Sequence, residues 1–163
     1  GLPRDGEEFT AGMLHDVGKL VLDLCFHDRF SEAIALTEAE GIPMREAERR
    51  IFDTDHAVVS AWLCQRWHIP DAMVEALRWH HEPERAQVDP VLAALIHLAD
   101  LFSRVRGHGF GGERTPVVVA ETPAWAILCR SRLDLLRTDL AGLTFRLEEE
   151  MARHGDMFLG SRS

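Results

Sequence analysis

The chain has 163 residues, of which 46% are hydrophobic and 28% charged, and its formal net charge is −9 at pH 7. This length suits a single globular domain; no apolar run approaches the roughly 20 residues of a membrane span and no signal peptide opens the sequence, so we expect a cytoplasmic protein without membrane contact. The negative charge and the lack of a basic stripe exclude the usual mode of binding to a nucleic acid polymer, which needs clustered Lys and Arg.

Helical periodicity dominates the first two thirds of the sequence. Apolar residues recur at helical spacing from Met13 to Leu24, and Gly41 is typical of a helix C-terminus. Asp55 has the position of an N-cap, and proline follows Asp89 as the first residue of a long apolar helix. The helices predicted in this region cover residues 7–27, 31–40, 43–52, 55–67, 70–81 and 89–106.

The last third of the sequence is less regular. Residues 107–121 hold four glycines and a proline, and their Val-Val-Val run is too short to build a sheet, so a loop is predicted. A short helix from Thr122 and a final helix over 133–154 complete the chain. We therefore predict an all-α fold, a compact bundle of about eight helices without significant sheet. It is one domain over 1–163, with a core of about 7–106 and a helical extension over 122–158.

The cysteines point to no special chemistry. Cys25, Cys64 and Cys129 are odd in number, far apart and without a CxxC pair, so neither a zinc knuckle nor a disulfide framework is indicated. Each lies among apolar neighbours, and we expect each to be a small buried hydrophobic residue.

Histidine and aspartate interrupt the predicted helices at several places. Imidazole nitrogens and carboxylate oxygens together suit divalent Fe, Mn, Zn or Ni, and a hydrolytic site also needs an open position for water, whose pKa the metal lowers. The candidate positions are His15, Asp16, His56, His80, His81, His97 and Asp100.

Each candidate has an ordinary alternative when it is considered alone. His56 lies in the first turn of a helix, and the His80–His81 pair at a helix end could complement the helix dipole. Asp100, on a very apolar helix, needs a partner if it is buried, and His97 could be that partner rather than a ligand.

The His15–Asp16 pair has better support than the other His-Asp pair of the chain, His27–Asp28, which we interpret as a solvated or capping pair at a helix end. In the motif HDVGK, Gly18 allows another backbone to come close, and Lys19 supplies a cation for a phosphate group.

Taken together and in this order, the motifs resemble the HD superfamily of helical metal-dependent phosphohydrolases. The segments "GLPRDGEEFTAGMLHDVGKLVL", "EAERRIFDTDHAVVSAWLCQRWHIPDAMVEALRWHHEPE" and "LIHLADLF" are most similar to the HDOD domain, an output domain of bacterial signalling proteins. The similarity extends from residue 1 to about residue 106. It implies an HD-type helical bundle and a regulatory role.

The resemblance also implies a divalent metal site, for Fe, Mn, Zn, Ni or Mg. In the catalytic relatives, Asp16 would bridge two metal ions with an attacking water between them, and Lys19 would stabilise charge on the phosphate. Glu48 matches an acidic position typical of HDOD sequences. The positions that match metal ligands are His15, Asp16, His56, His80, His81 and Asp100.

Three departures from the family pattern bear on this site. The helical subdomain and early histidine that normally precede the motif are missing, so we expect an N-terminally truncated domain. Asp53 and Ser60 stand where glycine is usual, which we expect to change backbone freedom more than chemistry. The GYP continuation of cyclic-di-GMP phosphodiesterases does not follow His81.

Two functions of different classes are consistent with these motifs. The first is a signalling module that acts through contacts with other signalling proteins or domains, and an exposed apolar face would favour a homodimer. The second is a metal-dependent phosphohydrolase or phosphodiesterase acting on a phosphate-containing small molecule or nucleotide. A helical scaffold whose His and Asp residues satisfy one another is the third interpretation.

Overall fold

The computed structural model describes residues 6–105 and 118–131, together with the isolated positions 142, 146, 149 and 153. The chain divides into two units, Gly1–Ser131 and Arg132–Ser163, and the first of them contains both continuous described segments. The predicted helix over 133–154 and most of the predicted loop over 107–121 lie outside the described residues.

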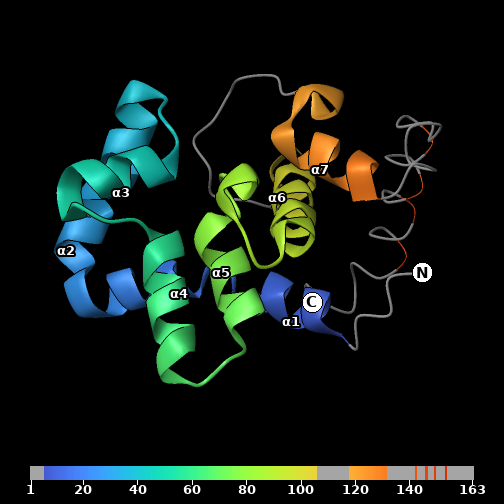
Figure 1. Ribbon diagram of the computed structural model, residues 1–163. Helices are drawn as coiled ribbons and strands as arrows, with labels where there is room; N and C mark the ends of the chain where they lie inside the picture. Colours follow the sequence, from blue (N-terminus) through green and yellow to red (C-terminus); the bar gives the residue numbers. More distant parts are fainter. Residues whose placement is uncertain are drawn as a thin grey trace. The chain divides into compact units, whose positions relative to one another are not determined.

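The described part of the chain is all-α, as predicted, and it contains no strand. Its elements, shown in Figure 1, are α1 (Glu7–Leu14), α2 (Val17–Glu40), α3 (Met44–Phe52), α4 (His56–Arg66), α5 (Asp71–Trp79), the 3-10 turn η1 (Pro83–Arg85), α6 (Pro90–Val105), the 3-10 turn η2 (Val119–Glu121) and α7 (Pro123–Ser131).

Side-chain caps begin three of these helices where the sequence predicts a start. Asp55 accepts a hydrogen bond from the backbone N–H of Val58 (3.1 Å), and Asp89 accepts one from Leu92 (2.9 Å). Thr122 does the same for Trp125 (3.1 Å) at the start of α7. Each bond satisfies an N–H group that the first turn of a helix leaves without an intrahelical partner.

The prediction of one helix over 7–27 and another over 31–40 was wrong. The first helix ends at Leu14, a turn at His15 and Asp16 comes next, and α2 then runs to Glu40 with a non-helical residue at Phe26. The break has a tertiary cause, because the hydroxyl of Ser60 on α4 donates to the His15 carbonyl (2.9 Å) and accepts from the Gly18 N–H (2.8 Å). The helix α4 thereby holds the turn between α1 and α2.

The helices that carry the site pack around two apolar clusters. Helices α4, α5 and α6 pack side by side; α2 packs against α4, α3 packs against α2, and α7 packs against α6 (Figure 1). One cluster centres on the fully buried Leu77 and Leu92, and the other joins Ala33 of α2 to Met44 and Ala47 of α3. Burial of a leucine side chain stabilises a fold by about 1.5–3 kcal/mol, so these clusters fix the helices that carry the site.

Two expectations about single residues need correction or refinement. Cys64 and Cys129 are buried as expected, but Cys25 is exposed, because it projects from the solvent-facing side of α2. Asp53 takes a left-handed conformation (φ 57°) at the C-terminus of α3, a conformation that costs an L-residue about 1–2 kcal/mol and glycine nothing. This explains why glycine is usual at that position.

No helix in the described residues has both the length and the hydrophobicity required to cross a membrane.

Candidate metal centre

Three separate elements bring four histidines and an aspartate to one place. The α1–α2 turn supplies His15 and Asp16, the first residue of α4 is His56, and His80 and His81 follow the last turn of α5. Nε2 of His56 lies 3.3 Å from Oδ1 of Asp16 and 2.8 Å from Nε2 of His81. Nε2 of His15 lies 3.4 Å from Oδ2 of Asp16. These five residues are the ones that the sequence singles out, apart from Asp100.

Their donor atoms form two overlapping groups. The first consists of His56, His80 and His81, the second of His15, Asp16 and His80, and within each group the donor atoms lie within 4.8 Å of one another. His56 and His80 are buried, whereas the Asp16 side chain is 35% exposed. The cluster therefore opens to solvent on the Asp16 side.

Hydrogen bonds donated by Nδ1 set the tautomers of three of these rings. Nδ1 of His15 donates to the Gly12 carbonyl (2.7 Å), and Nδ1 of His80 donates to the Leu77 carbonyl (2.6 Å). Nδ1 of His56 donates to a carboxylate oxygen of Glu48 (2.5 Å). Because each Nδ1 donates its hydrogen to one of these acceptors, Nε2 is the ring atom left to bind a metal ion. This is the arrangement that metal-ligating histidines use.

The donor set fits a divalent ion. Nε2 of His15, Nε2 of His80 and Oδ1 of Asp16 are buried and have no hydrogen-bond partner in the described structure. Buried polar atoms are costly unless they are satisfied, and mutual pairing of the side chains leaves these three unsatisfied. An ion bound by imidazole nitrogens and a carboxylate oxygen would satisfy them, and this mixed set suits Fe, Mn, Zn or Ni better than Mg.

Electrostatics favour the ligand forms of these groups. Burial, together with the charge of neighbouring His56, holds the pKa of His80 well below its usual range. Burial and the adjacent His80 do the same to the pKa of His81. Burial by itself would raise the pKa of Asp16, but Lys19 and the neighbouring histidines outweigh it and bring that pKa to about 2. The rings of His80 and His81 are thus neutral and the Asp16 carboxyl is ionised, as metal binding requires.

Lys19 and Asp100 lie at the edge of the cluster. Nζ of Lys19 is 2.7 Å from Oδ2 of Asp16, so its charge is within reach of any group bound at that carboxylate. Oδ1 of Asp100 is 4.0 Å from Nε2 of His15, and its other oxygen is 3.1 Å from Arg104. Asp100 therefore has Arg104 as its ion-pair partner and lies outside both donor groups.

His97 does not pair with Asp100 but supports the cluster through the backbone of His80. Its Nδ1 donates to the backbone carbonyl of His80 (2.8 Å). The bond fixes the backbone that positions the His80–His81 pair, and it gives His97 a structural role that the sequence left open.

Sequence reasoning assigned no role to Glu48, and the structure supplies one. The side chain is fully buried, and one carboxylate oxygen accepts from both Nδ1 and the backbone N–H of His56 (2.9 Å for the latter). The signal was present in the spacing, because Met44, Ala47 and Ile51 mark the apolar face of α3 and Glu48 falls on that face. A carboxylate on an apolar face needs a partner, and here the partner is a candidate ligand.

Gly18 has the role expected from the motif. A Cβ built at this position would lie 2.1 Å from the His56 carbonyl oxygen, so only glycine lets α2 approach the start of α4. Ser60, which we expected to alter mainly backbone freedom, instead holds the His15–Gly18 turn through its hydroxyl. Together Gly18 and Ser60 bring Asp16 next to His56.

Comparison with known proteins identifies the family of the chain. The HDOD domain family matches residues 1–83, just over half of the chain. The chain belongs to the HDOD family. The matched segment contains the cluster residues, Lys19 and Glu48, whereas Asp100 lies beyond it.

Two relatives extend the comparison. A crystal structure of an HDOD domain protein of unknown function from Geobacter sulfurreducens is similar with a TM-score of 0.72 and 25% identity, over 90% of this chain and 49% of that one. An uncharacterized protein of Treponema pallidum (strain Nichols) is 25% identical over 75 residues, which are 46% of this chain and 15% of that protein. The HDOD chain thus spans about half of the first relative and a small part of the second.

Proposed function

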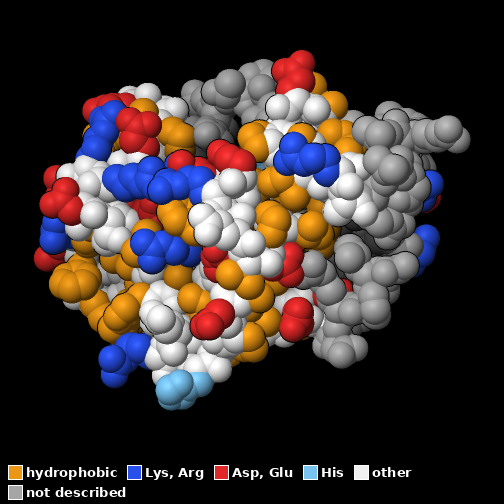
Figure 2. Space-filling view, viewed as in Figure 1, with side chains coloured by type: hydrophobic (Ala, Val, Ile, Leu, Met, Phe, Trp, Pro, Cys, Tyr) orange, Lys and Arg blue, Asp and Glu red, His pale blue; other side chains and the backbone are white. Residues whose placement is uncertain are grey.

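We propose that the protein is a regulatory module of bacterial signal transduction that acts mainly through contacts with other proteins. The observation that carries this proposal is a set of large apolar side chains left at the surface. Phe9 and Met13 are one helical turn apart on α1, and Leu20 and Leu24 are one turn apart on α2; their exposed fractions run from 63% to 84%. Hydrophobic side chains also reach the surface over α2 and α4 in Figure 2.

Paired exposed apolar residues at helical spacing are typical of helix faces that meet another chain. Trp62 and Trp67 at the end of α4 are half exposed as well, and aromatic residues are enriched at protein interfaces. A homodimer is the simplest assembly that would cover such a face.

Light scattering tests this surface. We expect the protein to dimerise as its concentration rises and the Leu20→Glu/Leu24→Glu variant to stay monomeric, because a charge on this face opposes burial. Glu32→Lys, at an exposed position of α2, is a suitable control. Leu36→Glu is not, because Leu36 packs on the α2–α3 cluster. A wild-type monomer at high concentration would count against the proposal.

We also propose that the histidine and aspartate cluster holds a divalent ion. His15, Asp16, His56, His80 and His81 would hold it, and the unsatisfied buried atoms of His15, Asp16 and His80 support this. When bound, such an ion supplies Lewis acidity toward a phosphoryl oxygen.

The second candidate function is phosphohydrolysis, and Lys19 favours it. Its ammonium group, beside Asp16 and partly exposed, is placed to attract a phosphate group to the open side of the cluster. In the absence of a bound phosphate, Lys19 neutralises the carboxylate.

Metal analysis tests the ion. Protein purified without chelator or nickel resin is expected to carry stoichiometric Fe, Mn or Zn, and Asp16→Ala is expected to lose it because the variant removes a charged oxygen donor. Asp23→Ala, an exposed carboxylate of α2, is the matched control. Metal-free protein that gains no ion on addition of Mn, Fe or Zn would refute the metal centre, and turnover of a phosphodiester would favour the hydrolase.

A further inference from the structure

Three arginines surround one carboxylate beside the candidate metal centre. A single carboxylate oxygen of Glu82 lies 3.2 Å from Arg45, 3.5 Å from Arg85 and 3.6 Å from Arg49. Arg49 also donates from Nε to Asp55 (2.8 Å). Three positive charges thus share two negative ones, in a chain whose formal net charge is −9.

The arginine cluster, defined as Arg45, Arg49 and Arg85, lies at the border of the metal centre. Glu82 directly follows His81, and Asp55 directly precedes His56. Burial and the neighbouring histidines are the main causes that lower the pKa of His81, and the positive charge of Arg45 lowers it further. A ligand held by these arginines would therefore lie beside the two segments that carry His56 and His81.

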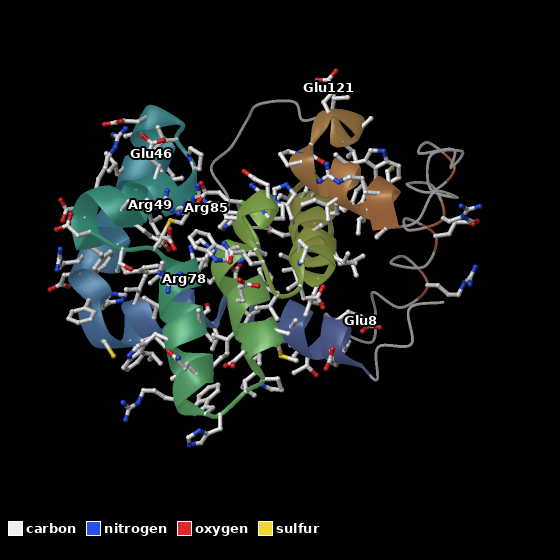
Figure 3. The ribbon with its side chains drawn as sticks, viewed as in Figure 1. Glu8, Glu46, Arg49, Arg78, Arg85 and Glu121 are labelled. Atoms are coloured by element: carbon white, nitrogen blue, oxygen red, sulfur yellow. The ribbon has the colours of Figure 1, made fainter. Side chains whose placement is uncertain are left out.

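The cluster is held in place and reachable from solvent. The Arg85 guanidinium lies 3.9 Å from the centroid of the Trp79 ring, which fixes its plane. Arg45 is 23% exposed, Arg49 46% and Arg85 54%. Figure 3 shows Arg49 and Arg85 extending toward each other from α3 and η1, and Figure 2 shows Lys and Arg side chains gathered on the same face of the molecule.

A purely structural ion network explains this arrangement poorly. Partly exposed ion pairs contribute little to stability, and like charges that converge on one acceptor repel one another. Of the three arginine contacts to Glu82, that of Arg45 is the shortest at 3.2 Å, and that of Arg85 is at the limit of a hydrogen bond at 3.5 Å. Planar guanidinium groups around a shared oxygen are, by contrast, the arrangement that binds phosphate through paired N–H donors.

We propose that Arg45, Arg49 and Arg85 form a binding site for the phosphate group of a small phosphate ester, and that Glu82 occupies this site when the ligand is absent. The phosphate group and the Glu82 carboxylate compete for the same three arginines, and the bound phosphate displaces the carboxylate. The proposal extends the proposed function by giving the metal centre a neighbouring ligand site, but phosphate binding itself requires no metal.

Calorimetric titration of metal-free protein with pyrophosphate tests the site at low ionic strength. We expect Arg45→Gln/Arg85→Gln to weaken binding at least about tenfold, because each lost charge-assisted contact weakens anion binding. Glu82→Gln is expected to strengthen binding about fivefold, since it removes the competing charge. If the double variant unfolds, the Arg85→Gln single variant serves instead, because Arg85 is the most exposed of the three arginines and its substitution disturbs the fold least.

The matched control is Arg50→Gln/Arg66→Gln, which makes the same change in net charge. Arg50 pairs with Glu40 and Glu46, and Arg66 lies over the Trp62 ring, so neither approaches Glu82. Equal losses in the control and cluster variants would overturn the proposal, as would unchanged or weaker binding in Glu82→Gln. Binding that depends on Lys19 and not on the arginines would overturn it too.

Metal titration of the same variants separates this proposal from the metal centre. Arg45→Gln/Arg85→Gln is expected to keep its metal while losing pyrophosphate binding. Protein that binds pyrophosphate through the arginines but no metal would leave this site standing and refute the metal centre. Metal binding without any pyrophosphate binding would refute the arginine site alone.

Discussion

Gly18→Ala is expected to lower the free energy of unfolding by about 3 kcal/mol, the upper end of the usual cost of overpacking a rigid interface. The added Cβ would meet the His56 carbonyl oxygen at 2.1 Å and the Ser60 nitrogen at 2.9 Å. Both are backbone atoms, so no side-chain rotation can relieve the clash and α2 must move away from α4. Thermal and urea unfolding monitored by circular dichroism measure the loss.

Gly12→Ala is the matched control for this variant. Gly12 lies inside α1, and a Cβ there would have nothing within 4 Å. Alanine within a helix is favoured over glycine by about 0.5–1 kcal/mol, so this variant should be slightly more stable than the wild type. If the unfolding temperature of Gly18→Ala equalled that of the wild type, the inferred close approach of α2 to α4 would be refuted.

Glu48→Ala is expected to weaken metal binding by about 10–100-fold, the usual effect of removing a group that orients a metal-ligating histidine. The variant removes the acceptor for both the Nδ1–H and the backbone N–H of His56. The ring would then lose its fixed orientation and tautomer. Competition with a chromogenic chelator, measured on metal-free protein, gives the affinity.

Glu48→Gln refines this test. The amide oxygen can still accept from Nδ1–H, so we expect a smaller loss than in Glu48→Ala, and the difference reports the carboxylate charge. Glu46→Gln is the control, because Glu46 is on the same helix, exposed, and paired with Arg50 instead. Metal affinity that is unchanged in both Glu48 variants would show that this carboxylate does not position His56.

The fold could be predicted from local signals wherever those signals act within one helix. Asp55, Asp89 and Thr122 cap helices that begin where expected, since capping depends on residues only a few positions apart. The helix break at His15 and Asp16 could not be predicted in this way. It depends on Ser60, which is 45 residues from His15 in sequence.

The candidate site likewise contains residues that the sequence could identify and residues that only the tertiary structure reveals. The residue types and their order identified His15, Asp16, His56, His80 and His81, because chemistry restricts which side chains can serve as ligands. Their supporting groups were harder to identify: Glu48 is one of two acidic residues in α3, and although it falls on the apolar face of that helix, only the structure shows that His56 is its partner. The structure likewise assigns Asp100 to Arg104, an ion-pair partner that the sequence analysis did not consider.

The Ser60 hydroxyl bridge has a consequence for communication within the protein. It ties the turn that carries His15 and Asp16 to the helix that carries His56, and the same turn begins the helix that exposes Leu20 and Leu24. A partner that distinguishes two positions of this turn would alter the affinity for the ion. By thermodynamic reciprocity, the ion would alter the affinity for that partner by the same factor. Metal occupancy and partner binding would then be two readouts of a single equilibrium.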